Sequence, residues 1–388
     1  MTRIIEFLIA LGIVAVLALA VGLVLPSHRH ISESVETNRK MTIVYDAVNS
    51  LIRFKDWNPL VLRDPHMQLN VSGPAAGVGA RLDYSSTDGR LGKGSWEIVE
   101  SVPNEKVVIK LDNPQRGKDK KVQFLLEPTG KNNRNAKITQ PYDVDYGWNL
   151  LGRYAGLYVS RHVGDDVKLG LGRMTNMLAS VPNFDYRAEG VPLVDLKLVD
   201  LPAEDLLVVT AGNIERNNDA IKQSIKNNQE WIKRTMEANN LEAAGPLRII
   251  TTDFGAERYA FDVAVPVRRK GSSAPAAAAA PAAEGEDKDA VEAATPAPAF
   301  PVAAQGEPLQ VKIPEGAPVQ YVRTEPRRAA FASYTGYMAE LDAVRNSVRA
   351  WALTHGHEVT DRPFEIWKGG LDKSFTADGS YDVFWAVK

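Results

Sequence analysis

The chain of 388 residues contains no cysteine. This absence excludes disulfide bonds, iron–sulfur clusters and zinc sites built on thiolates. A chain without thiols suits an oxidising compartment, although many cytosolic proteins lack cysteine as well. The absence of cysteine therefore excludes several kinds of site, but it does not decide in which compartment the protein lies.

The chain also lacks an excess of charge of either sign. Its 46 lysines and arginines stand against 48 aspartates and glutamates, which gives a formal net charge of -2. No overall field then attracts polyanions. The basic clusters at 268–270 and 327–328 are short and carry no interleaved aromatic residues. We therefore expect no nucleic-acid partner.

The common catalytic and metal-binding motifs are missing as well. The sequence has no H-E-x-x-H, no G-x-S-x-G, no Walker A loop and no dinucleotide-binding G-x-G-x-x-G. The close histidine pairs, His28 with His30 and His355 with His357, are two residues apart. A helical zinc motif needs two histidines four residues apart. We expect neither a metal nor a cofactor.

One long apolar run is present near the N-terminus. From Phe7 to Leu25 the chain has no charge and no proline, and Pro26 follows. At about 1.5 Å per residue the run covers roughly 28 Å, close to the apolar thickness of a bilayer. This predicts a transmembrane anchor at 4–25. The alternative is a cleaved signal peptide, but the residues before Pro26 offer no A-x-A-like cleavage site.

The orientation of this anchor does not follow from its flanks. Basic residues stand on both sides of the run, so the positive-inside rule does not decide between the two topologies. Large domains translocate despite a modest charge bias. We expect a single-pass membrane protein whose soluble domains lie on the periplasmic or extracytoplasmic side.

Composition divides the soluble part into two domains. The stretch at 270–310 is rich in alanine and proline and almost free of large apolar residues, which predicts a disordered linker. A second boundary falls near 181–183, where a helical pattern gives way to a strand pattern. The expected domains are therefore 31–181 and 191–388, the latter interrupted by the linker.

The sequence of the first domain predicts strands followed by a helix. The β-rich runs at 106–111 and 122–126 are separated by a turn-forming segment. After Gly164, apolar residues recur at one face of a helix: Val167, Leu171, Met174 and Leu178. A sheet followed by a long helix predicts an α+β fold.

The second domain contains a repeated pattern. Each copy has an amphipathic helix, then a strand that begins with proline, then an alternating strand at its end. The paired segments are 221–236 with 334–351, 246–250 with 363–367, and 261–267 with 381–387. Three matching elements in the same order predict an internal duplication.

The segment 31–181 resembles the SRPBCC superfamily, which includes START-like and polyketide-cyclase-like domains. The residues that carry the resemblance are FKDWNP at 54–59, GVGA at 77–80, GSWEIVE at 94–100 and FLLEP at 124–128. The resemblance implies a helix-grip fold, in which a curved antiparallel sheet wraps a long C-terminal helix. It also implies a hydrophobic cavity for lipids or other apolar ligands.

The duplicated region resembles the GyrI-like effector-binding domain. The resemblance is carried by the two terminal strands, by Ala350-Trp351-Ala352 with His355-Gly356, and by PFEIW at 363–367. It implies that Glu365 lies in an apolar cleft and meets lipophilic cations. In the first copy the same slot holds Arg248. The chain lacks a helix-turn-helix region, so direct transcriptional control is not implied.

Strand alternation adds a prediction about Glu365. It places Glu365 and Trp367 on one face of their strand and the flanking Phe364 and Ile366 on the other. A carboxylate beside an indole would attract a lipophilic cation through charge and cation–π contact, or serve as a general base. The alternative is a glutamate that faces water. The further ligand-binding candidates of this domain are Tyr334, Trp351 and Trp385.

Aromatic residues are the candidates in the first domain. They are Trp57, Trp96 and Phe124, with Tyr142 and Trp148 as further members. They could line a ligand cavity, or they could simply fill a core, as aromatics at core spacing commonly do. No set among them supplies a nucleophile, a base and an oxyanion donor together.

Three hypotheses follow for function. The first is a membrane-anchored sensor or carrier that binds hydrophobic or amphipathic small molecules. The second is a hydrolase that uses Glu365, or a cyclase-like enzyme in the first domain. The third is a structural envelope protein whose cavities are filled by its own side chains. The sequence does not indicate a protein partner.

Overall fold

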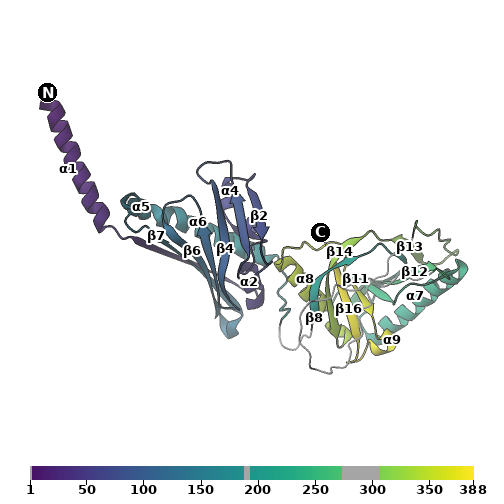
Figure 1. The fold of residues 1–388 in the computed structure, drawn as a ribbon. Coiled ribbons are helices and arrows are strands. Elements are labelled where there is room, and N and C mark those ends of the chain that lie inside the picture. The colour runs from purple at the N-terminus through teal and green to yellow at the C-terminus, as the bar shows by residue number, and fades with distance from the viewer. Residues whose placement is uncertain (1, 188–192, 273–305) are drawn as a thin grey trace, which may run out of the picture. The chain divides into compact units, whose positions relative to one another are not determined.

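The computed structural model describes residues 2–187, 193–272 and 306–388 (Figure 1). The chain divides into two compact units, one from Met1 to Asp185 with Thr354–Gly356 and one from Tyr186 to Leu353 with His357–Lys388. The division at Asp185 falls between the expected domain bounds of 181 and 191. Most of the expected linker, 273–305, lies outside the described residues.

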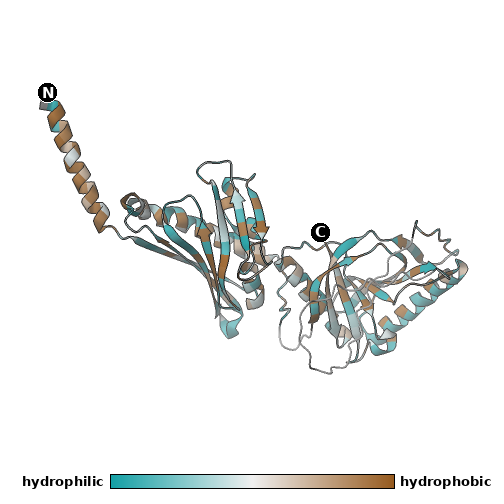
Figure 2. Cartoon of the chain, viewed as in Figure 1, coloured by the Kyte–Doolittle hydropathy of each residue, from teal (hydrophilic) through white to brown (hydrophobic). Residues whose placement is uncertain are grey.

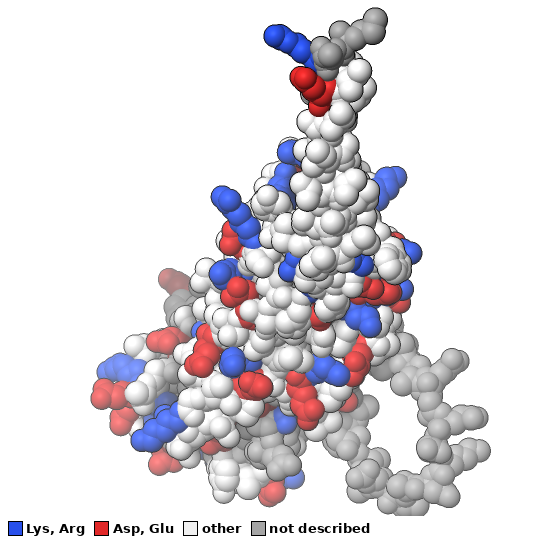
Figure 3. All heavy atoms as spheres, turned by 90° about the vertical axis from the view of Figure 1, so that its left-hand side faces the viewer, with Lys and Arg blue, Asp and Glu red and all other residues white. Residues whose placement is uncertain are grey.

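Unit 1 begins with α1 (Thr2–Val24), a helix that is long and apolar enough to cross a membrane. A signal sequence meets the same test of length and composition. Figure 2 shows α1 in brown almost throughout, and in Figure 3 most of its length is free of charged side chains. Leucine, isoleucine, valine and alanine dominate α1, and its side chains are exposed.

The remainder of unit 1 is an antiparallel sheet of seven strands with short helices and one long helix. The strands follow the order β1-β7-β6-β5-β4-β3-β2 across the sheet. The elements are β1 (His28–Thr37), α2 (Met41–Val48), α3 (Phe54–Trp57), α4 (Leu60–Arg63), β2 (Gln68–Ser72), β3 (Arg81–Ser85), β4 (Lys93–Val102), β5 (Lys106–Asp112), β6 (Lys118–Thr129), η1 (Lys131–Asn133), β7 (Asn135–Asp145), α5 (Leu150–Ala155), η2 (Gly156–Tyr158) and α6 (Val159–Ala179).

The long helix α6 buries the apolar stripe that its sequence predicts. The four residues of the stripe, at 167, 171, 174 and 178, are all buried. The predicted start after Gly164 is wrong, because the helix begins at Val159, five residues before Gly164. Gly164 lies inside the helix, where a Cβ would stand 3.7 Å from Ile31 of β1. A Cβ at that distance makes an ordinary van der Waals contact, so the packing does not require a glycine, and Gly164 does not mark a helix boundary.

Unit 2 is built on a second antiparallel sheet. Among the described residues it has nine strands, in the order β13-β9-β12-β11-β15-β16-β14-β8, with β10 paired to β12. The elements are β8 (Leu193–Leu201), β9 (Asp205–Glu215), α7 (Asn218–Ala238), β10 (Leu241–Ala243), β11 (Arg248–Phe254), β12 (Arg258–Arg269), β13 (Val319–Arg323), β14 (Arg327–Thr335), η3 (Met338–Glu340), α8 (Leu341–Thr354), β15 (Phe364–Trp367), α9 (Gly370–Lys373) and β16 (Ser380–Val387).

The predicted repeat of a helix followed by two strands is present in unit 2, although the second helix begins at Leu341 and Tyr334, expected in that helix, lies on β14. The order strand-strand-helix-strand-strand occurs as β8-β9-α7-β11-β12 and again as β13-β14-α8-β15-β16, with β10 added in the first copy. The two copies exchange their first strands, because β8 pairs with β14 of the second copy and β13 pairs with β9 of the first. The copies meet at the centre of the sheet through β11 and β15. The α+β class expected from the sequence therefore describes both units.

Candidate ligand-binding site

A cavity of about 110 Å³ lies in unit 1 between the sheet, α6 and the segment of α3 and α4. Four aromatic side chains contribute to its wall: Trp57, Trp96, Tyr84 and Tyr142. Trp57 and Trp96 meet edge to face with ring centroids 6.3 Å apart. Large aromatic side chains that stop short of filling the space between helix and sheet leave room for a guest.

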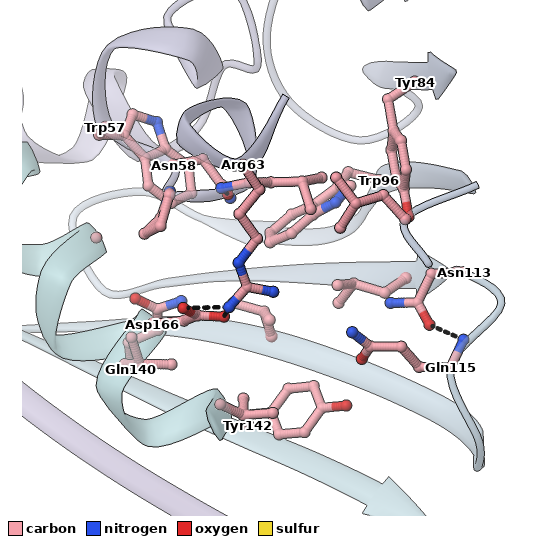
Figure 4. Close-up of a pocket in the computed structure, with 18 of the residues that line it drawn as sticks. Trp57, Asn58, Arg63, Tyr84, Trp96, Asn113, Gln115, Gln140, Tyr142 and Asp166 are labelled. Carbon is pink, nitrogen blue, oxygen red and sulfur yellow. Dashed lines mark hydrogen bonds and ion pairs between the residues drawn. The ribbon is translucent and has the colours of Figure 1, made fainter. Parts of the chain in front are cut away.

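An ion pair crosses the cavity. Arg63, at the end of α4, places Nη2 2.7 Å from Oδ1 and 2.6 Å from Oδ2 of Asp166 on α6. Figure 4 shows the Arg63 side chain reaching past Trp57 and Trp96 to this carboxylate. Burial raises the pKa of Asp166, and the nearby Arg63 charge acts in the opposite direction.

A wider basin of about 680 Å³ adjoins this inner cavity. The two share lining residues, among them Arg63, Arg90 and Tyr142. The basin extends along α5, η2 and the first turns of α6 through Ala155 and Tyr158. Ligand pockets in proteins commonly measure about 300–1,000 Å³. The inner cavity alone suits a small group, and the cavity with the basin suits a larger amphipathic molecule.

Two buried polar atoms at the cavity have no hydrogen-bond partner. They are Nε1 of Trp57 and Oε1 of Gln140, on side chains that are 2% and 4% exposed. A buried polar group without a partner costs roughly 1–3 kcal/mol. Both side chains line the cavity, so the two unpaired atoms lie in its wall.

A buried lysine forms hydrogen bonds to the turn at the rim of the cavity. Lys120 on β6 donates from Nζ to the carbonyl of Asn113 at 2.9 Å, to the carbonyl of Gln115 at 2.8 Å and to the Asn113 side chain. Asn113 and Gln115 line the cavity from the turn between β5 and β6. Burial lowers the pKa of Lys120, and Asp112 opposes that shift. Burial also raises the pKa values of Tyr84 and Tyr142.

The sequence-predicted aromatics of unit 1 separate into three groups. Trp57, Trp96 and Tyr142 line the cavity. Phe124 is fully buried and packs edge-on against Trp57, with ring centroids 5.6 Å apart. Trp148 is 83% exposed, so it belongs to the surface.

Sequence reasoning missed the polar members of the site. Gln140 and Tyr142 are two residues apart on β7, and every second residue from Ile138 to Val144 is buried. The period-two pattern was therefore a usable signal, because it places Gln140 on the same face as Tyr142. The contact of Arg63 with Asp166 joins residues 103 positions apart and had no local signal.

In unit 2, Glu365 is fully buried beneath the helices. It shares its face of β15 with Trp367, which belongs to the core that also contains the apolar faces of α7 and α8. Arg345 of α8 donates from Nε to Oε1 of Glu365 at 2.5 Å. Oε2 of Glu365, Nη1 of Arg345 and Nε1 of Trp367 are buried without partners. The charge of Glu365 is thus neutralised by the protein itself, which the sequence analysis did not anticipate.

Tyr259 lies beside this pair, and its pKa is shifted mainly by burial. Its hydroxyl lies 2.9 Å from the Thr251 hydroxyl and accepts from Arg345 at 3.3 Å. Burial raises the pKa of Tyr259 to about 12. Burial acts to lower the pKa of Arg345, but the adjacent carboxylate of Glu365 outweighs it and raises that pKa.

Arg248 does not share the face of Glu365, although the sequence analysis places both in the same slot of the repeat. The residue directly opposite Glu365 is Ile249, whereas Arg248 is opposite Ile366. Opposed residues share a face of a sheet, and a shift of one residue moves a side chain to the other face. Arg248 therefore lies on the far face, where it stacks on Phe364 and forms a buried ion pair with Glu204.

The other candidates of unit 2 lie on β14, β16 and α8. Tyr334 is buried and stacks on Tyr381 with centroids 5.9 Å apart. Trp385 is half-buried, donates from Nε1 to the carbonyl of Asp361 and lies under Arg349. Trp351 is half-buried against the core of unit 2. Within the described ranges, no group of three or more His, Asp or Glu side chains could hold a metal ion.

No protein-family model matches the chain, and no curated protein matches it. Among solved structures, norcoclaurine synthase of Thalictrum flavum is similar at 11% identity and a TM-score of 0.32, over 41% of this chain and 91% of that one. A solution structure from Thermobifida fusca is similar at 15% identity and a TM-score of 0.31, over 39% and 93%.

A third solved structure, an EcmrR–DNA complex, is similar over more of the chain. It shows 13% identity and a TM-score of 0.35, over 62% of this chain and 72% of that one. At TM-scores of 0.35 and below, none of the three similarities assigns a family or a function.

Proposed function

We propose that the protein is a membrane-anchored sensor or carrier that binds a hydrophobic or amphipathic small molecule in unit 1. The observation that carries this proposal is the aromatic-walled cavity with two unpaired buried polar atoms, Trp57 Nε1 and Gln140 Oε1. Burial of apolar ligand surface provides the main driving force, and the polar atoms fix the orientation. A ligand with an apolar body and a hydroxyl or amide group fits both requirements.

The finer fold assignments belong to the same proposal. We infer a helix-grip domain of the SRPBCC type for unit 1, because its seven-stranded antiparallel sheet packs against the long terminal helix α6. We infer a GyrI-like domain for unit 2 from its duplicated arrangement. The helix α1 serves as an uncleaved anchor, with the soluble units on the extracytoplasmic side. Proteolysis of the soluble units in intact spheroplasts tests this orientation, and their protection would reverse it.

Binding in unit 1 is tested in two steps. Native mass spectrometry of the detergent-purified full chain first shows which small molecules co-purify. A thermal-shift screen with fatty acyl compounds then ranks candidate ligands, since a ligand that binds only the folded state raises the melting temperature.

A matched pair of variants locates the binding site. Trp57→Phe removes the buried Nε1 and should reduce the ligand-induced shift. Trp148→Phe removes the same atom from an exposed indole and should leave the shift unchanged. Equal shifts in both variants and in the unaltered protein would place the ligand elsewhere.

Glu365 supports a second candidate, a site for a lipophilic cation or a hydrolytic general base in unit 2. The unpaired, buried Oε2 of Glu365 favours it. A cation that binds there has to displace the guanidinium of Arg345, which now occupies the carboxylate. A Glu365→Gln variant that keeps full affinity for lipophilic cations, and full turnover of any substrate found, would rule this candidate out.

A further inference from the structure

Exposed apolar side chains gather at one place in unit 1, in and beside α5 and η2. Trp148, Leu151, Leu157 and Tyr158 are 83%, 67%, 51% and 60% exposed. Other exposed large apolar residues of this sheet and its helices, such as Val71, are scattered along the chain. A contiguous exposed apolar patch marks a site of interaction.

The α5 helix is fastened to the C-terminal end of α1. Arg153 donates from Nη1 to the carbonyl of Leu23 at 2.9 Å and to that of Leu25 at 3.2 Å. The Tyr154 hydroxyl donates to the carbonyl of Ala18 at 2.6 Å. The last carbonyls of a helix have no partners within the helix, and a cation is favourable beside them. These bonds hold α5 level with the last turns of α1.

The position of α5 along α1 identifies what covers the apolar patch. The apolar helix Arg3–Val24 has 22 residues and covers about 33 Å, so its C-terminal end lies at the boundary between hydrocarbon and water when it spans a bilayer. Tryptophan and tyrosine are enriched at that boundary because their rings are apolar and their tips are polar. Trp148 lies just before α5 and Tyr158 ends η2, with Leu151 in α5 and Leu157 in η2.

We propose that residues 148–158 form a bilayer-interface seat, which inserts into the lipid surface beside α1. The proposal rests on the proposed membrane anchoring by α1. The same segment supplies Ala155 and Tyr158 to the wall of the basin in front of the cavity, next to Val159 and His162. The seat therefore places part of the basin wall at the lipid surface. The ligand class narrows to amphipathic molecules that partition into the bilayer surface.

Single introduced cysteines test the seat, because the chain has no cysteine of its own. The full chain is reconstituted into phosphatidylcholine–phosphatidylglycerol vesicles with an environment-sensitive fluorophore on Leu151→Cys. An interfacial segment lies about 5–10 Å into the headgroup and acyl boundary. We expect a loss of fluorescence with nitroxide lipids labelled near the headgroup and a smaller loss with lipids labelled at the end of the acyl chain.

Two matched positions complete the experiment. Val71→Cys lies on β2, which is exposed and is the last strand at the sheet edge opposite β1, and it should show no quenching by either lipid. Val14→Cys in α1 should be quenched by the deep nitroxide. Quenching at 14 without quenching at 151 would overturn the seat and leave the anchor intact. Absence of quenching at 14 would overturn the anchor and the seat together. Leu157→Cys repeats the measurement if a label at 151 perturbs α5.

Discussion

The two units contain the same kind of ion pair in opposite surroundings. In unit 1, Arg63 and Asp166 are 43% and 37% exposed and cross a cavity that opens to solvent through the basin. In unit 2, Arg345 and Glu365 are 3% and 0% exposed and lie inside the core under α8. An exposed pair exchanges its partners for water at little cost, whereas a buried one does not. The first pair can therefore open for a ligand, and the second fixes its helix to its sheet.

The largest expected effect comes from breaking the buried pair. Arg345→Met leaves the Glu365 carboxylate buried without its partner, which costs roughly 3–5 kcal/mol. Denaturant unfolding of the full chain should show this loss in the transition of unit 2. The double variant Arg345→Met with Glu365→Met should recover most of the stability, since it removes both charges. A loss that the double variant does not recover would show that packing rather than charge holds α8.

A smaller loss of unfolding free energy is expected at alkaline pH, from the ionisation of Tyr259 in unit 2. The folded-state pKa of Tyr259 is raised from 10.0 to about 12, so its contribution is complete below pH 10.0 and is lost as the pH rises through about 12. Two pKa units correspond to roughly 2–3 kcal/mol. Other buried tyrosines titrate in the same direction, so the measurement is the difference between the protein and Tyr259→Phe. An identical decline of unfolding free energy in both would contradict the assignment.

At Gln140, in the cavity of unit 1, we expect a substitution to preserve or raise stability and to weaken ligand binding. Gln140→Leu removes the unpaired Oε1, so the free energy of unfolding should stay constant or rise by up to about 1 kcal/mol. Ligand affinity should fall about tenfold, which corresponds to about 1.4 kcal/mol. Calorimetric titration with the ligand identified by mass spectrometry measures the change. Gln123→Leu on β6 is the control, because Gln123 is not among the cavity-lining residues. An affinity equal to that of the control would exclude Gln140 from the site.

The smallest effect on stability is expected at the exposed pair. Asp166→Asn should change the free energy of unfolding by less than about 1 kcal/mol, because water screens a half-exposed pair. Ligand association should nonetheless speed up in stopped-flow measurements if the pair closes the cavity. A loss of unfolding free energy as large as that of Arg345→Met would show that both ion pairs stabilise the fold equally. The contrast between the two units would then be wrong.

The sequence predicts what depends on local periodicity and misses what depends on distant pairing. The stripe of α6 and the repeated helix-strand-strand pattern of unit 2 were readable because the side-chain period reports the buried face. Arg345 was overlooked although it follows Leu341 by four residues, which is helical spacing on an apolar face. The exchange of β8 and β13 joins strands more than a hundred residues apart and leaves no mark in either strand.

The exchange of β8 and β13 between the two copies affects what happens when the chain is cut between them. If the polypeptide is cut anywhere between residues 272 and 306, β8 stays hydrogen-bonded to β14 and β13 stays hydrogen-bonded to β9. Each fragment thus lends an edge strand to the other, and neither can complete its part of the sheet alone. Separately produced fragments should reassemble into one working unit, which makes the cut site a natural point for splitting the protein into a reporter pair.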